Sequence, residues 1–185
     1  MPYIRVIEPE DAEGELREEY ERLLGSRGKL AAIHTIHSLS PAALRAHMDL
    51  YLTLMFGRSK LRRDVREAIA VVVSRANGCA YCDEHHAQAL LAYWKDEARL
   101  EALRRDPREA GLDARTVAIL DHAALLTRRP DGAGPDDVER LRQHGVSDEE
   151  ILDLTLITAY FNFVNRIVMG LGVEVQGDEA KGYRY

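Results

Sequence analysis

The sequence predicts a protein built from α-helices. Helix-start and helix-stop signals dominate the chain, and only residues 69–73 have the strongly β-branched composition of a buried strand. The 185 residues contain no Ser/Gly linker, no low-complexity tract and no repeat, which fits one domain. We therefore expect a single all-α domain over residues 1–185, with its reactive core at about residues 60–95.

The first half of the chain contains three expected helices. Residues 13–25 have the amphipathic pattern of a surface helix. An N-cap serine followed by a first-turn proline, Ser40-Pro41, opens a helix that runs to residue 56. Residues 62–76 contain no Gly or Pro, begin with charged residues and end at Asn77-Gly78, a pair suited to a helix stop. Their apolar middle predicts that this helix is buried.

The run Ile-Ala-Val-Val-Val at residues 69–73 could instead form a strand leading into the cysteine pair, as in thioredoxin. That fold needs several strands around its redox motif. Only residues 173–175 offer another segment with strand character. We therefore expect residues 69–73 to be helical.

The second half of the chain contains four expected helices, defined by the same kinds of signal. They are residues 79–95; residues 114–127, which Asp113 can cap; a helix from Pro135 to a stop at Gly145; and the apolar residues 151–164, preceded by the Ser147-Glu150 capping box. Residues 183–185 are expected to be a tail.

Composition excludes several classes of partner. The 25 Lys and Arg residues against 31 Asp and Glu give a formal charge of −6, and neither sign forms a block, so nucleic acid is not an expected partner. The first residues lack the apolar core of a signal peptide, and no stretch approaches the roughly 18 apolar residues of a membrane span. We expect a cytoplasmic protein that does not bind membranes.

The chain has two cysteines, Cys79 and Cys82, and they stand together in a C-x-x-C motif. With 46% hydrophobic residues, the protein can build a core without disulfides. In a reducing cytosol such a pair is expected to cycle between dithiol and disulfide, or to bind metal. The motif is therefore interpreted as chemical rather than architectural, and both uses stay open at this point.

Both cysteines are expected near the N-terminus of helix 79–95, Cys79 in its first turn and Cys82 one turn later. Unpaired N–H groups and the helix dipole stabilise a thiolate there. At about 100° per residue, His86 lies about 20° from Cys79 and about 40° from Cys82, so it is a better-placed base than His85. The apolar stripe predicts that Cys82 and His86 point inward and that Cys79 lies nearer solvent.

The segment from Glu67 to His86 has the spacing E-x11-C-x2-C-x3-H. It resembles the core of alkylhydroperoxidase AhpD, within the wider carboxymuconolactone decarboxylase-like superfamily. Residues 161–166 (FNFVNR) and 170–174 (GLGVE) resemble the C-terminal segment of the peroxidase-related branch, so the resemblance covers most of the chain. It implies an AhpD-like helical bundle that assembles as a homo-oligomer, a trimer or a hexamer.

The resemblance also implies a thiol peroxidase of antioxidant defence. Cys82 would attack a hydroperoxide and become sulfenic acid, Cys79 would condense with it, and a protein or small-molecule thiol would reduce the resulting disulfide. Glu67 and His86 would form a proton relay, provided that they meet across their two helices. The catalytic residues would be Cys82, Cys79, His86 and Glu67. We expect no metal and no cofactor, because the sequence has no complete nucleotide or flavin fingerprint.

Tyr81 departs from the best-known pattern of this family, which has histidine beside the second cysteine. A tyrosine can donate a hydrogen bond, but it cannot shuttle protons near neutral pH as imidazole does. The main alternative is a general disulfide oxidoreductase in which Cys79 attacks a partner's disulfide. Lactone decarboxylases of the same superfamily do not rely on a cysteine pair, so the pair argues against that lyase reaction. A non-catalytic oligomeric binder is a third class.

Zinc binding is a further alternative, because His85 or Glu67 could join Cys79, Cys82 and His86 as ligands. A structural zinc site usually draws a second ligand pair from another segment, and no further cysteine exists. The other histidines have no motif around them, and we assign them no role: His34, His37, His47, His122 and His144.

The last predicted helix carries two further groups of residues. Its aromatic and apolar stripe has helical spacing, which favours the core or a subunit interface over a cofactor site. The members of this stripe are Leu152, Leu156, Tyr160 and Phe163. Three polar residues, Asn162, Asn165 and Arg166, interrupt the apolar pattern. We expect them to cap neighbouring helices or form a network between subunits, rather than to line a substrate pocket.

Overall fold

The computed structural model describes residues 1–175 and 177–180, and within these residues it contains nine α-helices, three short 3-10 turns and no strand. The helices are α1 (Gly14–Arg27), α2 (Ala32–Thr35), α3 (Pro41–Phe56), α4 (Arg63–Asn77), α5 (Ala80–Trp94), α6 (Glu97–Arg105), α7 (Ala114–Arg128), α8 (Pro135–Gln143) and α9 (Asp148–Leu171). The predicted all-α class is confirmed, and residues 69–73 lie within α4 as expected.

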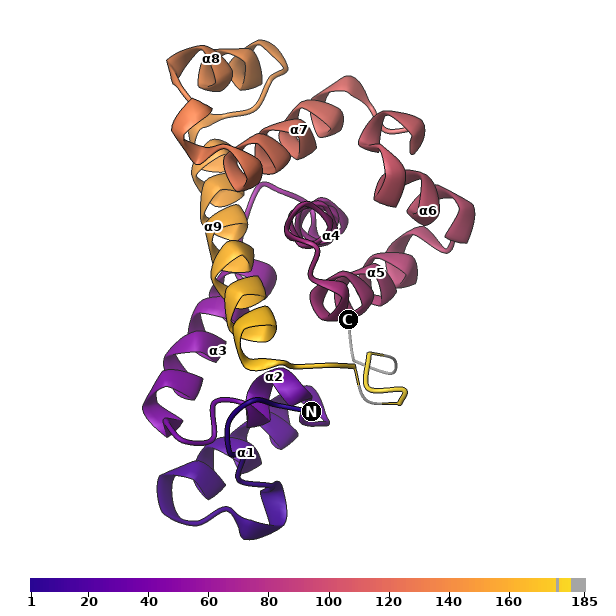
Figure 1. The fold of residues 1–185 in the computed structure, drawn as a ribbon. Coiled ribbons are helices and arrows are strands. Elements are labelled where there is room, and N and C mark those ends of the chain that lie inside the picture. Colours follow the sequence, from indigo (N-terminus) through magenta and orange to yellow (C-terminus); the bar gives the residue numbers. More distant parts are fainter. Residues whose placement is uncertain (176, 181–185) are drawn as a thin grey trace.

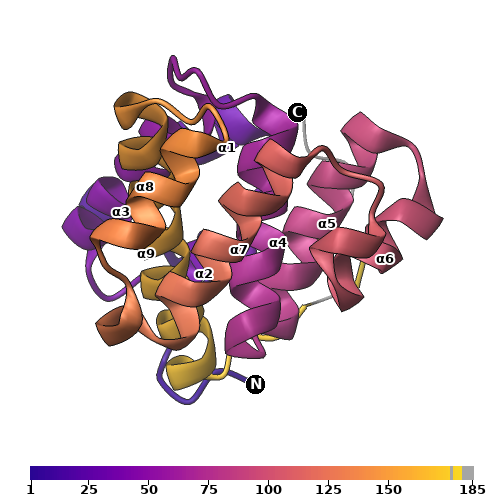
Figure 2. The ribbon, with the colours of Figure 1, turned by 90° about the horizontal axis from the view of Figure 1, so that it is seen from above.

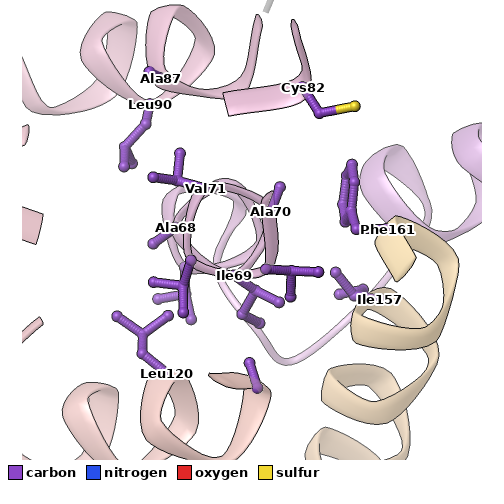
Figure 3. Packing of buried hydrophobic residues seen from close by; sticks show 14 of the residues in the cluster. Ala68, Ile69, Ala70, Val71, Cys82, Ala87, Leu90, Leu120, Ile157 and Phe161 are labelled. Atoms are coloured by element: carbon purple, nitrogen blue, oxygen red, sulfur yellow. The ribbon is translucent and has the colours of Figure 1, made fainter. Parts of the chain in front are cut away.

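Helix α4 is the central element, with α5, α7 and α9 packed around it (Figures 1 and 2). Every residue from Val65 to Ser74 is buried. Small side chains such as Ala68 and Ala70 alternate with Ile69 and Val71, so neighbouring helices can approach on all sides (Figure 3). A helix that is apolar all round is stable only when it is enclosed in this way.

A smaller layer, formed by α1, α2 and α3, lies beside one end of α9 (Figure 1). Helices α1 and α3 pack together through a separate apolar cluster that includes Leu16, Leu23, Leu44 and Met48. Helix α3 also contacts α4 and α9. The layer therefore faces the part of the helical core where α5 and α9 approach each other.

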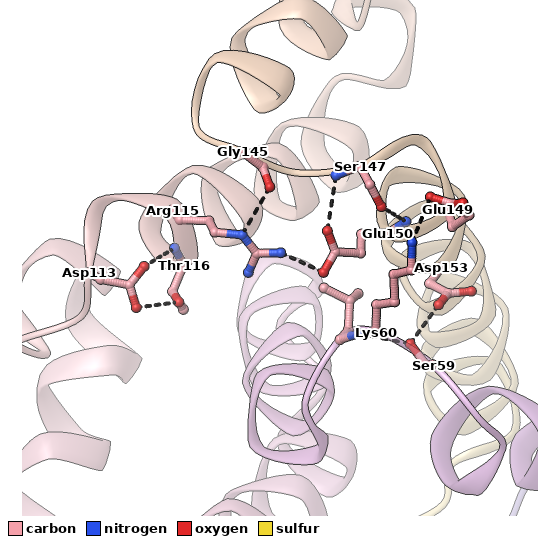
Figure 4. Close-up of polar contacts among 11 residues, drawn as sticks. Ser59, Lys60, Asp113, Arg115, Thr116, Gly145, Ser147, Glu149, Glu150 and Asp153 are labelled. Atoms are coloured by element: carbon pink, nitrogen blue, oxygen red, sulfur yellow. Dashed lines mark hydrogen bonds and ion pairs between the residues drawn. The ribbon is translucent and has the colours of Figure 1, made fainter.

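The predicted caps at the starts of α7 and α9 are confirmed (Figure 4). The Asp113 carboxylate accepts a hydrogen bond from the Thr116 backbone N–H at 2.8 Å and caps α7. At the start of α9, the Glu150 carboxylate accepts a bond from the Ser147 N–H at 3.0 Å, and the Ser147 hydroxyl accepts one from the Glu150 N–H at 3.4 Å. These bonds satisfy N–H groups that the helices leave unpaired.

Two predicted helix stops are confirmed, because Gly78 and Gly145 follow α4 and α8 with φ angles of 71° and 75°. Other boundaries were wrong. Helix α5 begins one residue later than expected, so Cys79 is its N-cap residue. Helix α9 continues beyond residue 164 to Leu171, because its apolar pattern persists to the left-handed Gly172.

Two helices were not predicted. Helix α2 has only four residues, which is too short for an apolar period to show in the sequence. Helix α6 is strongly charged, although Asp96 caps it by accepting a bond from the Arg99 N–H at 2.9 Å. Residues 173–175 are not in a strand, and the expected tail at residues 183–185 lies outside the described residues.

Helix α9 has the length and composition to cross a membrane, and it is the one such helix among the described residues. We had expected no stretch of this kind. The core helix of a soluble protein meets the same criterion, and α9 packs against α3, α4, α7 and α8. Its polar residues Asn162, Asn165 and Arg166 are also costly in a bilayer. The length and the composition of α9 alone therefore do not indicate a membrane protein.

Gly172 is favoured by its backbone conformation. Its φ is 68°, and an added Cβ would lie 2.5 Å from the ring of Tyr3, an exposed side chain that can move aside. Replacement by alanine is expected to lower the free energy of unfolding by about 1–2 kcal/mol, because the left-handed conformation strains a residue that has a Cβ. Thermal unfolding of Gly172→Ala can be compared with Gly25→Ala, where a Cβ meets nothing within 4 Å. Equal melting temperatures for the two variants would contradict this account.

Candidate active site

A cavity of about 70 Å³ lies between α5, α9 and the layer of α1, α2 and α3. Cys82 and His86 line it from α5, Tyr160 and Phe161 from α9, and His47 from α3. The Cys82 sulfur points away from α5 toward the side where Phe161 stands (Figure 3).

Glu67 and His86 meet across α4 and α5, as predicted. His86 Nδ1 lies 2.7 Å from Glu67 Oε2, and the carboxylate is fully buried. Burial alone raises the pKa of Glu67, but the charges and hydrogen bonds of His86 and Arg63 outweigh it and lower that pKa. The ionised carboxylate thus holds the imidazole through Nδ1. Nε2 is the ring nitrogen left for the cavity.

Arg63 is a site residue that the sequence interpretation missed. Its Nε donates to Glu67 Oε1 at 2.8 Å, and its Nη1 donates to the Met55 carbonyl at 2.6 Å. The guanidinium also lies over the Phe56 ring, 3.7 Å from the centroid. The sequence held a signal, because Arg63 and Glu67 are four residues apart on one helix and such pairs face each other. Arg63 supplies the positive charge that a buried carboxylate needs.

The two cysteines are free thiols, and both are buried, with exposed fractions of 1% for Cys79 and 3% for Cys82. The prediction that Cys79 lies nearer solvent was therefore wrong in terms of exposure. Cys79 lines a surface depression together with Tyr3 and residues 172–175. The two cysteines nevertheless line different hollows: Cys82 lines the cavity, whereas Cys79 lines a separate surface depression.

The thiols are electrostatically unequal. A hydrogen bond from the Cys82 thiol lowers the pKa of Cys79; burial and Asp83 oppose this effect, and the N–H groups at the start of α5 reinforce it. The same hydrogen bond, together with burial, raises the pKa of Cys82 well above its ordinary value. The first proton therefore leaves the pair from Cys79, and the remaining proton is shared with Cys82. The expectation that the helix N-terminus would acidify both thiols holds for Cys79 alone.

Asn165 is a second site residue that was missed, because we expected it to be purely structural. It is fully buried, and a hydrogen bond from its amide lowers the pKa of Cys82, although the raising effects are larger. The amide is fixed on both sides: Asn77 Nδ2 donates to its Oδ1 at 2.9 Å, and its Nδ2 lies 3.3 Å from the Ser74 hydroxyl. Asn162 belongs to the same network and donates to the Thr127 hydroxyl at 3.0 Å.

Replacing Asn165 with leucine is expected to slow alkylation of Cys82 and to lower the free energy of unfolding by about 1–3 kcal/mol. The sulfur loses a donor, and Asn77 and Ser74 lose partners. Peptide-resolved labelling with iodoacetamide measures the first effect. Asn162→Leu is the matched control. It removes the Asn162 side chain, which accepts a hydrogen bond from Asn77 in the same network, and it leaves Asn165 in place. If both variants label Cys82 at the same rate, Asn165 does not act on the sulfur.

Tyr81, which departs from the family pattern, holds segments together. Its hydroxyl accepts a hydrogen bond from the Ile33 N–H at 3.1 Å, and its ring lies 4.4 Å from that of His85. His85 Nε2 in turn lies 3.2 Å from Glu179 Oε1 in the C-terminal segment. Tyr81 therefore ties the redox motif to α2, and His85 ties it to the chain's end.

Two histidines to which we assigned no role line the cavity, His34 and His47. His34 Nδ1 accepts a hydrogen bond from the Ala31 N–H at 2.9 Å, and burial lowers the pKa of His34 to about 3. His47 Nε2 lies 3.0 Å from the Tyr160 hydroxyl. No sequence motif marks these residues, because they come from elements far from the cysteines.

The apolar stripe of α9 divides between two environments. Tyr160 is buried at the cavity, whereas Leu152, Leu156 and Phe163 are 58%, 41% and 49% exposed. The exposed members match the alternative of a subunit interface rather than that of the core. Across the described part of the chain, no group of three or more His, Cys, Asp or Glu side chains is arranged to hold a metal ion.

The fold and this site define a class: helical proteins in which a C-x-x-C pair opens a helix whose histidine meets a buried glutamate on the preceding helix. The model of the Carboxymuconolactone decarboxylase family matches residues 41–124. An uncharacterized peroxidase-related protein from Silicibacter sp. TM1040 is 32% identical, with a TM-score of 0.83, over 92% of this chain and 89% of that one. The chain belongs to the AhpD-like group of the carboxymuconolactone decarboxylase-like superfamily.

Other relatives support this assignment. An uncharacterized peroxidase-related protein from Ralstonia eutropha JMP134, described as an alkylhydroperoxidase AhpD core, is 27% identical with a TM-score of 0.86 and covers 97% of this chain and 94% of its own. Uncharacterized protein YdfG of Bacillus subtilis (strain 168) is 28% identical over 137 residues, 74% of this chain and 91% of YdfG. The debrominase Bmp8 shares only the fold, with 17% identity and a TM-score of 0.79 over 97% of this chain and 95% of Bmp8.

Proposed function

We propose that the protein is a thiol peroxidase that reduces hydroperoxides with Cys82 and Cys79. One observation carries this proposal: Cys82 and the Glu67-anchored His86 line the same cavity, whereas Cys79 faces a separate depression. An oxidant can therefore meet Cys82 on one side while a reductant approaches Cys79 on the other. This separation suits a pair that alternates between two reactants.

The first step oxidises Cys82. Its thiol proton passes to His86 Nε2 while the sulfur attacks the terminal oxygen of the hydroperoxide, forming an S–O bond and breaking the O–O bond. Cys82 becomes sulfenic acid, and the departing alkoxide takes the proton from His86 and leaves as the alcohol. The Glu67 carboxylate stabilises the imidazolium that exists between the two proton transfers. The raised pKa of Cys82 slows this step, because the thiol gives up its proton less readily.

The second step forms the disulfide. The Cys79 thiolate attacks Cys82 Sγ and expels hydroxide, which becomes water on protonation. The lowered pKa of Cys79 in the reduced protein supports this role, because it makes the attacking thiolate more available than an ordinary thiol would. A thiol reductant, a protein or a small molecule, then returns two electrons through the depression beside Cys79 and restores both thiols.

The assembly and location complete the proposal. The exposed apolar residues of α9, Leu152, Leu156 and Phe163, would pack against other subunits in a trimer or a hexamer. We place the protein in the cytoplasm, where thiol reductants keep such a pair cycling.

A single-turnover experiment tests the reaction. Reduced protein is mixed with one equivalent of ethyl hydroperoxide, and ethanol and free thiols are counted. The proposal requires two thiols lost for each ethanol formed, because one peroxide yields one disulfide. Unchanged thiols and unconsumed peroxide would rule it out.

The lowered pKa of Cys79 also favours a second function, general disulfide exchange. In that case Cys79 would attack a partner's disulfide, and peroxide would be a poor substrate. Comparing the rates at which the reduced protein consumes ethyl hydroperoxide and glutathione disulfide separates the two. The fold itself does not choose the reaction, because a debrominase shares it.

A further inference from the structure

His47 is a buried polar residue that the steps above leave unused. It is 6% exposed and lines the reaction cavity from α3, across from the α5 wall that carries Cys82. Its Nδ1 is one of the few buried polar side-chain atoms without a hydrogen-bond partner in the part of the chain that the structure describes, and it has almost no accessible surface, so a reactant reaches it only when a neighbouring group moves. Such an atom is costly to bury unless it has a use or a transient partner.

The neighbours of His47 fix which ring nitrogen carries its proton. Nε2 lies 3.0 Å from the Tyr160 hydroxyl. Burial and the nearby His37 lower the pKa of His47 to about 3, whereas burial raises the pKa of Tyr160 well above its ordinary value. Both groups are therefore neutral at neutral pH. A neutral phenol donates to an imidazole nitrogen, which leaves the ring proton on Nδ1.

The ring is also held in place. His37 and Tyr160 make edge-on contacts with it, with centroids 4.7 Å and 5.7 Å away. Tyr160 is near the redox pair, because the charge of a Cys82 thiolate contributes to the raised pKa of Tyr160. The His47–Tyr160 unit is thus a neutral group beside the reaction cavity.

We propose that His47 Nδ1–H donates a hydrogen bond to the oxygen that leaves when Cys82 reacts with a hydroperoxide. This inference rests on the proposed function. As the O–O bond breaks, the electron pair moves to the organic oxygen, and the resulting alkoxide lies between the proton of His86 and the N–H of His47. His86 transfers its proton to give the alcohol, and His47 keeps its own. The terminal oxygen and its hydrogen stay on sulfur, so the products are the Cys82 sulfenic acid and the alcohol.

The inference assigns a task that Tyr81 does not perform in this structure. The Tyr81 hydroxyl is engaged by the Ile33 N–H, and its ring packs on His85. His47 and Tyr160 approach the cavity from α3 and α9 instead. The second polar group of the reaction cavity thus comes from outside the C-x-x-C motif.

The leaving group provides a selective test. Ethyl hydroperoxide and peracetic acid are similar in size, but the first expels ethoxide, a strong base, whereas the second expels acetate, which needs little stabilisation. Single-turnover oxidation of Cys82 is measured with both in wild type and His47→Leu. We expect the variant to react about 100-fold more slowly with ethyl hydroperoxide, the usual effect of removing one donor to a developing oxyanion. Its rate with peracetic acid should change little.

Further variants make the test specific. His47→Gln keeps an N–H donor and should recover part of the ethyl hydroperoxide rate. Tyr160→Phe no longer fixes the His47 tautomer and should show a smaller loss of the ethyl hydroperoxide rate relative to the peracetic acid rate. If His47→Leu does not fold, Tyr160→Phe is compared with wild type in its place. His34→Leu removes another neutral cavity histidine, whose Nδ1 already has a partner, and should leave the ratio of the two rates as in wild type.

The outcomes are distinct. Equal slowing with both oxidants in His47→Leu and Tyr160→Phe would mean that these residues only support the fold, and it would overturn the inference. Unchanged rates with both oxidants would overturn it as well. If wild-type protein reacts with neither oxidant, the proposed function itself fails, and this inference fails with it.

Discussion

Replacing Cys82 with serine is expected to abolish hydroperoxide consumption. Cys82 is the cysteine that shares the cavity with His86, and a serine hydroxyl is far too weak a nucleophile at neutral pH to replace it. Cys79→Ser should consume one equivalent of peroxide and then stop, because the sulfenic acid on Cys82 has no partner with which to condense. The measurement is the time course of peroxide loss with dithiothreitol excluded, at a known excess of peroxide over protein.

The two variants control for each other, because they replace neighbouring buried sulfurs with the same side chain. If Cys82→Ser consumed one equivalent and Cys79→Ser consumed none, the roles would be reversed. The lower pKa of Cys79 would then outweigh the position of Cys82 in the cavity.

Replacing Glu67 with glutamine is expected to affect both stability and rate. The free energy of unfolding should fall by about 3 kcal/mol, because the Arg63 guanidinium loses the anion that compensates it in the interior. Oxidation of Cys82 should slow about 100-fold, since His86 loses the carboxylate that orients it and stabilises its protonated form. Urea unfolding and single-turnover kinetics measure the two effects.

Glu150→Gln is the matched control. Glu150 is also buried and also paired with an arginine, because Arg115 Nη2 lies 2.5 Å from its Oε1, but the pair lies at the start of α9, away from the cavity (Figure 4). This variant should lose stability and keep the rate of Cys82 oxidation. If it slowed oxidation as much as Glu67→Gln, the kinetic effect of Glu67 would reflect the fold rather than the relay.

The stability effect of Glu67 should depend on pH. The folded-state pKa lies below the ordinary value of 4.5, so the unfolded chain takes up this proton first as the pH falls. The stabilisation is complete above 4.5 and is lost as the pH falls through the folded-state pKa. The difference in unfolding free energy between wild type and Glu67→Gln should therefore be constant at neutral pH and shrink in acid. A difference that grows in acid would contradict the lowered pKa.

Local signals were sufficient for most of the fold. The capping residues of α7 and α9, the stops at Gly78 and Gly145 and the helical reading of residues 69–73 each follow from a few neighbouring residues. The meeting of Glu67 and His86 was also predictable, because a tight turn between two helices brings such positions together. These features depend on contacts that are short in sequence.

The missed features depend on contacts between distant segments. Cys79 shares a surface depression with Tyr3 and residues 172–175, which are far from it in sequence, and no pattern around the cysteines indicates this. Asn165 reaches Cys82, and His47 reaches the cavity, only after α9 and α3 are placed against α4 and α5. A polar residue in an apolar helix signals that it has a partner, but its sequence context does not identify that partner.

The central claim is that Cys82 is the sulfur oxidised by the peroxide. The most direct measurement treats reduced Cys79→Ser with one equivalent of ethyl hydroperoxide, traps sulfenic acid with dimedone and locates the adduct by peptide mass spectrometry. We expect a dimedone adduct on Cys82 and one molecule of ethanol for each protein labelled. An unmodified Cys82 with the peroxide intact, while Cys82→Ser is labelled on Cys79 under the same conditions, would contradict it.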